Sequence, residues 1–312
     1  MSRLALGRPR LHAGGVRIVY FGLPLAALLL ASDGLEIELA VLSRVRAPGQ
    51  RRLARHLGEG QVLAGPDVSW EEIGARLRRL APDLLVSWFW TTKLPPSIVA
   101  TARLGGIGVH PSLLPRHRGP DPYFAAIDQG DSVTGVTVHR IADEYDTGAI
   151  LASRAVAMGA DWNAWQLARR LDRPSLALLR EVIGRLRRGE NVPERIQDET
   201  ETSWAPLPSV ADAALCWTWA TDKLLRRVRA LAPAPGAFTE IGGRIVTILE
   251  ARPARDFPWA LVPGEGAVWG GAAVVRTGDG AVELVRGEVD GALLDSGELA
   301  SLIAQSGELV IV

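Results

Sequence analysis

The sequence has few cysteines, no excess of either charge and no long apolar run. Cys216 is the only cysteine in 312 residues, which excludes an intrachain disulfide and a cysteine-based zinc cluster and indicates a reducing, cytoplasmic compartment. The 35 basic and 35 acidic residues cancel, so the chain as a whole is not drawn to nucleic acid or to anionic lipid. Metal-ligand spacings are missing as well. We therefore expect no metal and no membrane partner.

Several catalytic motifs are also missing. No Gly-x-Gly-x-x-Gly follows the first predicted strand, no Walker loop occurs, and no Gly-x-Ser-x-Gly elbow occurs. A dinucleotide site, a phosphate-binding loop of the Walker type and an elbow-type hydrolase are therefore unsupported. Gly22, at the end of the first predicted strand, is a place where a ligand can approach the backbone closely.

The N-terminal region allows two interpretations. Basic residues precede the apolar run 18–31, as in a signal peptide, but the run is short for a membrane span and no small-x-small cleavage site follows it cleanly. The alternative is a buried strand at 16–21, a turn at Gly22 and a helix at 25–31, which we favour. Residues 1–15 are then a leader without structure.

Apolar segments with strand character alternate with amphipathic helices along the first two thirds of the chain. Strands are predicted at 16–21, 36–42, 83–89, 106–109, 134–140 and 149–156, and helices at 25–31, 71–80, 94–103 and 162–188. Pro174 should kink or split the last helix. The alternation predicts an α/β fold with a doubly wound, mostly parallel, Rossmann-like sheet.

A proline-rich, acidic stretch at 191–208 reads as a linker. Beyond it a helix is predicted at 211–231, and short strands at 244–249, 272–276 and 282–285, two of them joined by the Thr277–Gly280 turn. This pattern predicts a small C-terminal β-barrel, OB-like in character. The expected division is a leader at 1–15, a catalytic domain at 16–190, a linker at 191–208 and a barrel domain at 209–312.

Two loops carry the candidate chemistry. His110 follows an apolar strand and lies in a loop stiffened by prolines, and Asp146 lies in the acidic loop one structural unit later. Loops at the carboxyl ends of adjacent strands meet, so a base and a carboxylate would converge there. The alternatives are a structural histidine and a turn carboxylate. We expect Asp143 and Glu144 to be solvated, and His117 and His139 to be structural.

A basic run extends from Arg44 to His56 without an acidic residue. A solvated loop is one interpretation, and a site for phosphate or for a tRNA backbone is the other. No aromatic residue interrupts the run, so base stacking is not indicated.

The sequence from Gly108 to Gly119, GVHPSLLPRHRG, and the later Asp146-Thr147-Gly148 resemble the formyltransferase family. That family has the pattern Asn-x-His-x-Ser-Leu-Leu-Pro-x-x-Arg-Gly followed by an Asp-Thr-Gly loop. Further similar segments are 16–22, 204–206, 229–231 and 235–237. The two-domain layout is similar to that of methionyl-tRNA formyltransferases, whereas sugar N-formyltransferases share the catalytic half.

The resemblance implies that 10-formyltetrahydrofolate donates a formyl group to a primary amine. It implies proton transfer by His110, and an Asp146 that orients His110 and takes protons from the amine. The residues implied in folate binding, largely through their backbone, are Trp88, Phe89, Trp90, Leu94, Ile141 and Tyr145. Those implied in binding the acceptor are Ser112, Leu113, Leu114, Pro115, Arg118 and Gly119, with loop positioning an equal alternative for Arg118.

Gly108 departs from the family pattern, whose asparagine at this place polarises the formyl carbonyl. Removing an oxyanion donor costs on the order of a hundredfold in rate. Another donor or a water can substitute, the acceptor can have changed, or the protein binds folate without turnover. The interpretations are therefore a methionyl-tRNA formyltransferase-like enzyme, an N-formyltransferase for an amino-sugar nucleotide or other small amine, a weakened folate-binding paralogue and a formyl-folate hydrolase.

The charge of the C-terminal third bears on the acceptor. From Ser203 onward there are nine basic and thirteen acidic residues, which argues against tRNA as a partner of that domain. The basic run at 44–56 compensates if it faces the acceptor stem. The oligomeric state is not predicted.

Overall fold

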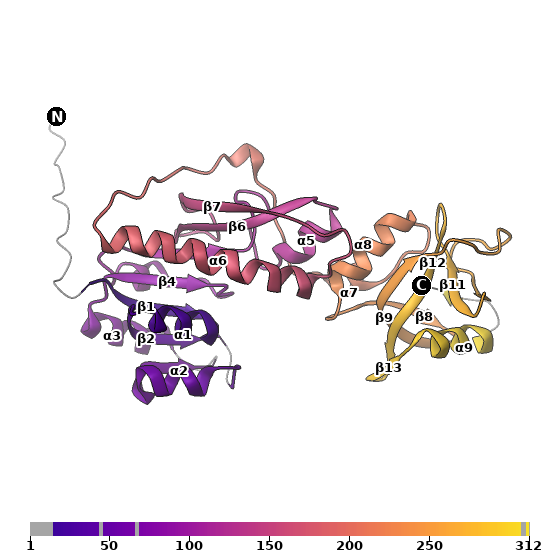
Figure 1. Cartoon of the computed structure of the whole chain (residues 1–312), viewed down its shortest axis with the longest axis horizontal. Coiled ribbons are helices and arrows are strands. Elements are labelled where there is room, and N and C mark those ends of the chain that lie inside the picture. The colour runs from indigo at the N-terminus through magenta and orange to yellow at the C-terminus, as the bar shows by residue number, and fades with distance from the viewer. Residues whose placement is uncertain (1–14, 44–45, 66–68, 307–309, 312) are drawn as a thin grey trace. The chain divides into compact units, whose positions relative to one another are not determined.

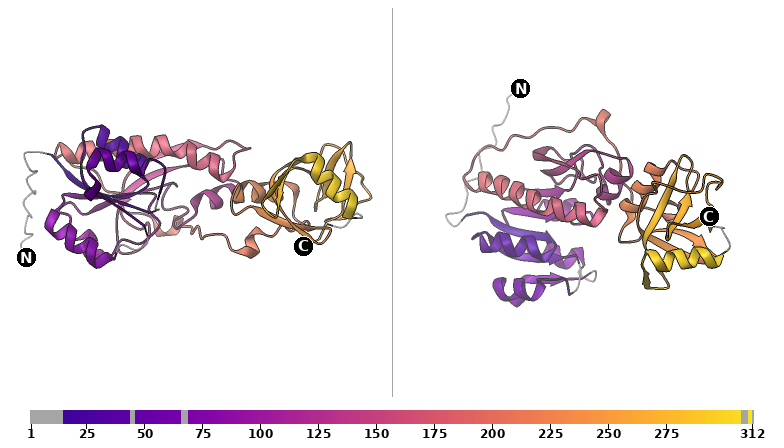
Figure 2. Two further views of the ribbon diagram at one scale, coloured as in Figure 1. Left: turned by 90° about the horizontal axis from the view of Figure 1, so that it is seen from below. Right: turned by 45° about the vertical axis from the view of Figure 1, so that its right-hand side comes forward.

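The computed structural model describes residues 15–43, 46–65, 69–306 and 310–311. The leader predicted at 1–15 lies outside the described residues except for Gly15, and so does Arg44 of the basic run. The chain forms two units (Figures 1 and 2). Unit 1 holds residues 1–119, 135–156 and 171–204, and unit 2 holds 120–134, 157–170 and 205–312.

A seven-stranded sheet organises unit 1. Its strands are β1 (Arg17–Gly22), β2 (Glu36–Leu42), β3 (Val62–Ala64), β4 (Leu84–Trp88), β5 (Gly106–His110), β6 (Val133–Arg140) and β7 (Ile150–Ala157), in the order β3-β2-β1-β4-β5-β6-β7. The first five are parallel, and β6 is antiparallel to β5. The mostly parallel, doubly wound sheet is confirmed. Because β1 is buried inside this sheet, the strand interpretation of residues 16–21 is confirmed as well.

Helices cover both faces of this sheet. They are α1 (Pro24–Ser32), α2 (Gln50–Leu57), α3 (Trp70–Leu80), α4 (Pro96–Val99) and the part of α6 (Ala164–Arg187) from Leu171 onward, whereas α5 (Pro122–Asp128) belongs to unit 2. Alternate residues of a strand point to opposite faces. Phe21 accordingly packs in a cluster with Ile73 of α3 and Ile98 of α4. On the other face, the Trp88 indole donates a hydrogen bond of 3.0 Å to the Ser175 hydroxyl of α6.

Pro174 does not split α6, so that part of the prediction is wrong. The helix is continuous over its 24 residues, Ala164–Arg187, with the proline inside it (Figure 1). Two observations explain this continuity. The Ser175 hydroxyl donates to the Asp172 carbonyl, two residues before the proline. Leu171, before the proline, and Leu178, after it, are both buried and anchor the helix by packing. Tertiary packing outweighs the local cost of the missing N–H.

The basic run is helical from Gln50 onward, so the loop interpretation is wrong for residues 50–57, whereas the described residues 46–49 are not helical. Leu53 alone on α2 is buried. Arg51, Arg52 and Arg55 are exposed on this helix. A single apolar anchor is too weak a pattern to predict a helix, which is why the sequence pointed to a loop.

An antiparallel seven-stranded sheet organises unit 2. Its strands are β8 (Ala237–Ile241), β9 (Arg244–Pro253), β10 (Gly266–Trp269), β11 (Ala272–Arg276), β12 (Ala281–Val289), β13 (Ala292–Leu294) and β14 (Val310–Ile311), and α9 (Ser296–Ser306) packs on it. The order is β10-β11-β12-β9-β8-β14, with β13 paired to β12. The three predicted strands and the hairpin at Thr277–Gly280 are confirmed. Closure into an OB-like barrel stays a prediction.

The helix predicted at 211–231 is two helices, α7 (Val210–Ala213) and α8 (Thr221–Leu231). Between them the chain leaves the helical path to bind β8. The Leu215 N–H donates to the Phe238 carbonyl, and the Trp217 indole donates to the Thr239 hydroxyl. Because these partners are distant in sequence, helical periodicity alone could not reveal the interruption.

None of the helices in the described ranges is long and apolar enough to cross a membrane. Within those ranges, no group of three or more His, Cys, Asp or Glu side chains is arranged to hold a metal ion.

Candidate active site

His110 ends β5 at the carboxyl edge of the parallel strands and is 6 % exposed. The loop that follows is fixed to β6. Thr137 Oγ1 donates to the Ser112 carbonyl (2.7 Å) and accepts the Leu114 N–H (3.1 Å), and the Ser112 hydroxyl donates to the Arg116 carbonyl (2.6 Å). These bonds hold the imidazole at the sheet edge before any ligand arrives.

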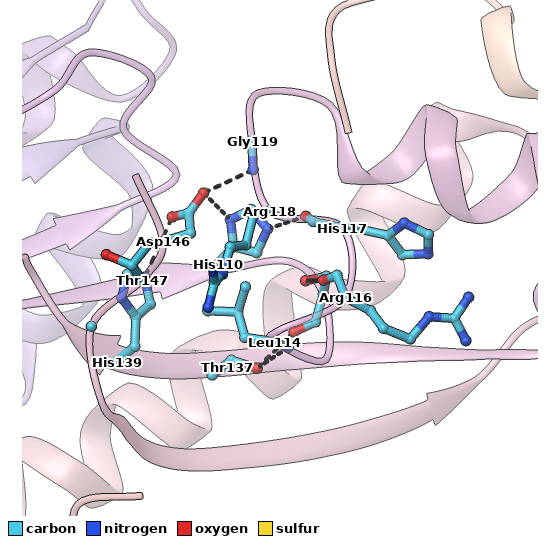
Figure 3. Close-up of polar contacts among 12 residues, drawn as sticks. His110, Leu114, Arg116, His117, Arg118, Gly119, Thr137, His139, Asp146 and Thr147 are labelled. Carbon is cyan, nitrogen blue, oxygen red and sulfur yellow. Dashed lines mark hydrogen bonds and ion pairs between the residues drawn. The ribbon is translucent and has the colours of Figure 1, made fainter. Parts of the chain in front are cut away.

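Asp146 is held in a left-handed backbone conformation, with φ of 57°, which aspartate tolerates better than most residues. Its carboxylate Oδ2 accepts the Gly119 N–H at 3.0 Å. The Gln197 side-chain amide donates to the carbonyls of Asp146 (2.6 Å) and Gly148 (2.7 Å). The carboxylate is therefore oriented from both sides of its loop (Figure 3).

The structure brings His110 and Asp146 together, with 3.5 Å between His110 Nδ1 and Asp146 Oδ2. The other ring nitrogen, Nε2, is 2.7 Å from the His117 carbonyl oxygen. A carbonyl only accepts hydrogen bonds, so Nε2 donates and carries a hydrogen. In the neutral ring, Nδ1 is then a bare lone pair that faces the carboxylate.

His139 is the site residue that the sequence interpretation missed. It lies on β6 and is 5 % exposed, and its Nε2 is 3.6 Å from Asp146 Oδ1. Its Nδ1 is 2.8 Å from the Arg140 carbonyl. The sequence showed no partner for His139, which led to the expectation of a structural role, and the structure supplies Asp146 as that partner. The His117 ring, by contrast, points away from Asp146 (Figure 3).

Burial lowers the pKa of His139, Asp146 raises it, and His110 lowers it again; the net pKa lies below the usual 6.5. A buried imidazolium is poorly solvated, which disfavours the charged form. The ring is thus mainly neutral at pH 7. A neutral imidazole can accept a proton there.

Gly108 is paired directly with His139 in the β5–β6 ladder. A Cβ at position 108 would lie 3.0 Å from His139 Nε2 and 3.2 Å from its Cε1. The space that a side chain at 108 would need is therefore filled by the imidazole from β6.

The residues predicted to bind folate lie on two loops that touch each other. The Tyr145 hydroxyl accepts the Lys93 N–H at 2.9 Å, and the Lys93 ammonium lies 3.4 Å from the Glu144 carboxylate. Trp88 and Leu94 are buried. Phe89 has φ of 51° and stacks on Trp88, and Ile141 packs half-buried against the core beside Leu94. Phe89, Trp90 and Ile141 are half-buried and Tyr145 is exposed, so both backbone and side chains of these loops are accessible.

Most of the residues predicted to bind the acceptor are buried or make contacts that fix the conformation of their own loop. The Arg118 guanidinium is buried and donates to Gln197 Oε1 and to both carboxylate oxygens of Glu199. The rest of this set, apart from the half-buried Leu113, is buried: Ser112, Leu114, Pro115 and Gly119. For Arg118 the geometry favours the alternative of loop positioning.

Three further observations bear on sequence expectations. A Cβ at Gly22 would meet the Trp88 carbonyl at 2.3 Å, so the close approach there is to strand β4 and not to a ligand. Asp143 and Glu144 are exposed, as expected. The segment predicted as a linker supplies Gln197 and Ser203, whose hydroxyl accepts the His117 N–H at 2.9 Å. Their polar character was visible in the sequence, but their partners lie some 50 to 90 residues away.

The chain matches two families of known proteins. The family described as formyl transferase matches residues 52–183, and the formyl transferase C-terminal domain matches residues 209–294. A methionyl-tRNA formyltransferase of Anaeromyxobacter dehalogenans (strain 2CP-1 / ATCC BAA-258) is 34 % identical over 296 residues, covering 88 % of this chain and 93 % of the relative. One from Chlorobium phaeovibrioides is 30 % identical, covering 96 % and 99 %.

Solved structures share the fold. HypX from Aquifex aeolicus in complex with tetrahydrofolic acid superposes with a TM-score of 0.66 at 21 % identity, covering 94 % of this chain and 47 % of that one. An N-formyltransferase from Helicobacter canadensis, in complex with folinic acid and dTDP-3-aminofucose, has a TM-score of 0.66 at 12 % identity, covering 86 % and 98 %. At these identities the likeness shows the fold alone.

Proposed function

The chain belongs to the formyl transferase family, and we propose that it transfers a formyl group from 10-formyltetrahydrofolate to the amine of methionyl-tRNA. The observation that carries the chemistry is the pairing of His110 and Asp146, 3.5 Å apart at the carboxyl edge of the sheet. The acceptor rests on relatives of that name, which match the chain over nearly its full length.

The folate supplies the formyl carbon when it is bound, and the loops at 88–94 and 141–146 would hold it. The Trp90 indole N–H supports this assignment, because it is buried and has no hydrogen-bond partner among the described residues. A buried donor without a partner is costly, and an acceptor atom of a bound ring would satisfy it. The carbonyls and amides of the same loops are available for a pterin.

His110 and Asp146 would move the protons of the transfer. An amine that attacks a formyl carbonyl becomes acidic as its nitrogen gains positive charge, and it needs a nearby acceptor. The Asp146 carboxylate accepts that proton or stabilises an imidazolium that has taken it. Because Gly119 and Gln197 fix the Asp146 loop, the carboxylate does not have to be ordered at each turnover.

Charge on α2 supports a polyanionic acceptor. Arg51, Arg52 and Arg55 are exposed, and within the described ranges none of them forms an ion pair with an acidic side chain. Unpaired surface cations of this kind bind phosphates. We also propose the domain division at 190 and 208, the OB-like closure of the second sheet and a cytoplasmic location.

A small amine, such as an amino-sugar nucleotide, is the second candidate acceptor. The acidic balance of the C-terminal third, nine basic against thirteen acidic residues, favours it. A small substrate needs no positive surface on that domain.

Consumption of 10-formyltetrahydrofolate with charged initiator tRNA, beside a panel of amino sugars, tests these proposals. Formylation of the tRNA, with an affinity that falls steeply as salt rises, is the expected result. Transfer only to an amino sugar replaces the first acceptor with the second. Release of tetrahydrofolate without any amine indicates a hydrolase, and folate binding without turnover indicates a weakened paralogue; both results overturn the proposed transfer.

A further inference from the structure

Gly108 and His139 are opposite residues of the antiparallel β5–β6 ladder. Opposite residues carry their side chains on the same face, and His110, two residues after Gly108, shares that face. Strand β5 has no side chain at 108, and the His139 ring lies within 3.0 Å of where its Cβ would be. The place beside His110 is therefore occupied by an imidazole that comes from the neighbouring strand (Figure 3).

The hydrogens on the two imidazoles can be assigned from their backbone partners. Each ring gives one nitrogen to a carbonyl: Nε2 of His110 to His117 at 2.7 Å, and Nδ1 of His139 to Arg140 at 2.8 Å. Those nitrogens must be donors. In the neutral rings the remaining nitrogens are bare, and they lie 3.5 Å and 3.6 Å from the two oxygens of Asp146.

When both rings are neutral, two lone pairs and one carboxylate converge with no hydrogen between them. A proton added to either ring replaces electrostatic repulsion with a charge-assisted contact to Asp146. Since both rings face the same carboxylate, the added proton belongs to the group of three and not to one member. The cluster is built to take up one proton and to release it.

We propose that His139 is a catalytic residue of the formyl transfer, acting through Nε2 in the place that Gly108 leaves open. This inference rests on the proposed function. As the lone pair of the amine forms the new bond to the formyl carbon, Nε2 of His139 takes a proton from the amine nitrogen. When the bond from the formyl carbon to the folate nitrogen breaks, that nitrogen keeps the electron pair and receives the proton from His139.

The charges around His139 fit this role. Burial lowers its pKa, so the proton-accepting form dominates at neutral pH, while Asp146 raises the pKa and so favours the imidazolium. Arg118, and His110 whenever its ring is protonated, add positive charge nearby and lower the pKa. Activity that requires the neutral ring falls when the pH drops through this pKa, which lies below 6.5.

The same geometry determines what Gly108→Asn would do. Its Cβ alone would crowd the His139 ring at 3.0 Å, and the amide group would displace that ring further. We therefore expect the single substitution to lower activity. Removing the ring as well, in G108N/H139A, leaves room for an asparagine and should restore part of the rate.

Kinetics of His139→Gln and His139→Ala test the proposal, with Arg79→Gln, an exposed residue of α3, as the control. We expect kcat to fall about 100-fold with KM for the folate changed only a few-fold, and the acid limb of kcat/KM to disappear in His139→Gln. G108N/H139A should exceed His139→Ala in kcat. A His139→Gln enzyme with the wild-type rate and pH profile overturns the proposal.

Histidine NMR gives a readout that does not need turnover, because the chain has only five histidines. The His139 signal, identified by its loss in His139→Gln, should titrate below pH 6.5; Asp146→Asn should lower its pKa, and His110→Gln should raise it. Adding 5-formyltetrahydrofolate should shift the signal. A merely structural His139 would also respond to Asp146→Asn, because the carboxylate lies 3.6 Å from its ring, but its signal would not shift with the folate.

The outcomes separate the two proposals. A wild type that formylates no amine overturns the proposed function, and the titration then decides on His139 by itself. A His139 signal that ignores both Asp146→Asn and the folate overturns the inference even if the enzyme is active. A coupled, folate-sensitive signal together with a slow His139→Gln enzyme supports both.

Discussion

Two carboxylates, Asp128 in unit 2 and Asp146 in unit 1, have opposite surroundings. In unit 2, the Arg227 guanidinium meets the Asp128 carboxylate in a bidentate pair at 2.7 Å and 3.0 Å and also donates to the Asp212 carbonyl. In unit 1, the Asp146 carboxylate is beyond hydrogen-bond distance of both nearby imidazoles, at 3.5 Å and 3.6 Å. A saturated pair stabilises a fold, whereas an unsaturated group is free to exchange protons. The contrast assigns chemistry to Asp146 and structural support to the Arg227–Asp128 pair.

Asp146→Asn is the substitution that should break this contrast most clearly. The amide cannot take a proton, but its oxygen can still accept the Gly119 N–H. We expect kcat to fall about 10²- to 10⁴-fold, with the free energy of unfolding changed by less than about 1 kcal/mol. Asp143→Asn, on an exposed residue of the same loop, is the control in the kinetic assay. Equal rates for the two variants would remove Asp146 from the chemistry.

Arg227→Met should show the reverse pattern. It leaves Asp128 partly buried without its partner, which should cost about 3 kcal/mol in the free energy of unfolding. Below the unfolding transition kcat should be unchanged. Urea denaturation measures the loss, and Arg244→Met, which breaks an exposed pair with Asp290, should cost under about 1 kcal/mol. A fall in kcat without a fall in stability would contradict the structural role of Arg227.

Gln197→Leu lies between these extremes, because it removes two donors from the Asp146 loop and an acceptor from Arg118. Leaving these groups unsatisfied should cost about 2 kcal/mol of stability, and a looser carboxylate should slow kcat several-fold. Thermal unfolding and steady-state rates measure the two effects together. Unchanged kcat would show that the loop keeps its geometry without the amide.

The combined Arg51→Gln, Arg52→Gln and Arg55→Gln variant should have the smallest effect on the fold. All three residues are exposed, so stability should change by less than about 0.5 kcal/mol. If they bind phosphates, KM for the tRNA should rise, and the slope of log affinity against log salt should become shallower by about 0.9 for each phosphate that is no longer neutralised. An unchanged slope would place the tRNA elsewhere. Arg78→Gln and Arg79→Gln on α3 provide a control for altered surface charge.

Local sequence patterns were enough to predict much of the seven-stranded sheet of unit 1. The predicted strand at 36–42 has the bounds of β2, because a continuous Val/Ile/Leu-rich run has few other ways to bury itself. Helix α3 carries its own start signal, since the Ser69 hydroxyl accepts the Glu72 N–H. An apolar run and a helix N-cap each depend on a few neighbouring residues, so both can be predicted without knowing their packing partners.

Features that depend on distant partners were missed. Helix α2 has one buried residue, Leu53, and the break between α7 and α8 exists because Leu215 and Trp217 bind β8. His139 belongs to the site only through the register that places it opposite Gly108. The loop pattern correctly predicted that His110 and Asp146 lie close together. The sequence of the two loops does not determine the strand register, so it could not predict that His139 joins them.

The segment at 120–134 lies within the catalytic half of the sequence yet packs in unit 2, where α5 contacts α8. A chain truncated after residue 204 would therefore lack α8, so α5 would lose its packing partner and Asp128 would lose its counterion, Arg227. Truncation at that point would yield an aggregation-prone fragment instead of a catalytic domain that folds independently. Separate expression of the halves is thus a poor way to assign their roles, and point substitutions in the whole chain are the safer route.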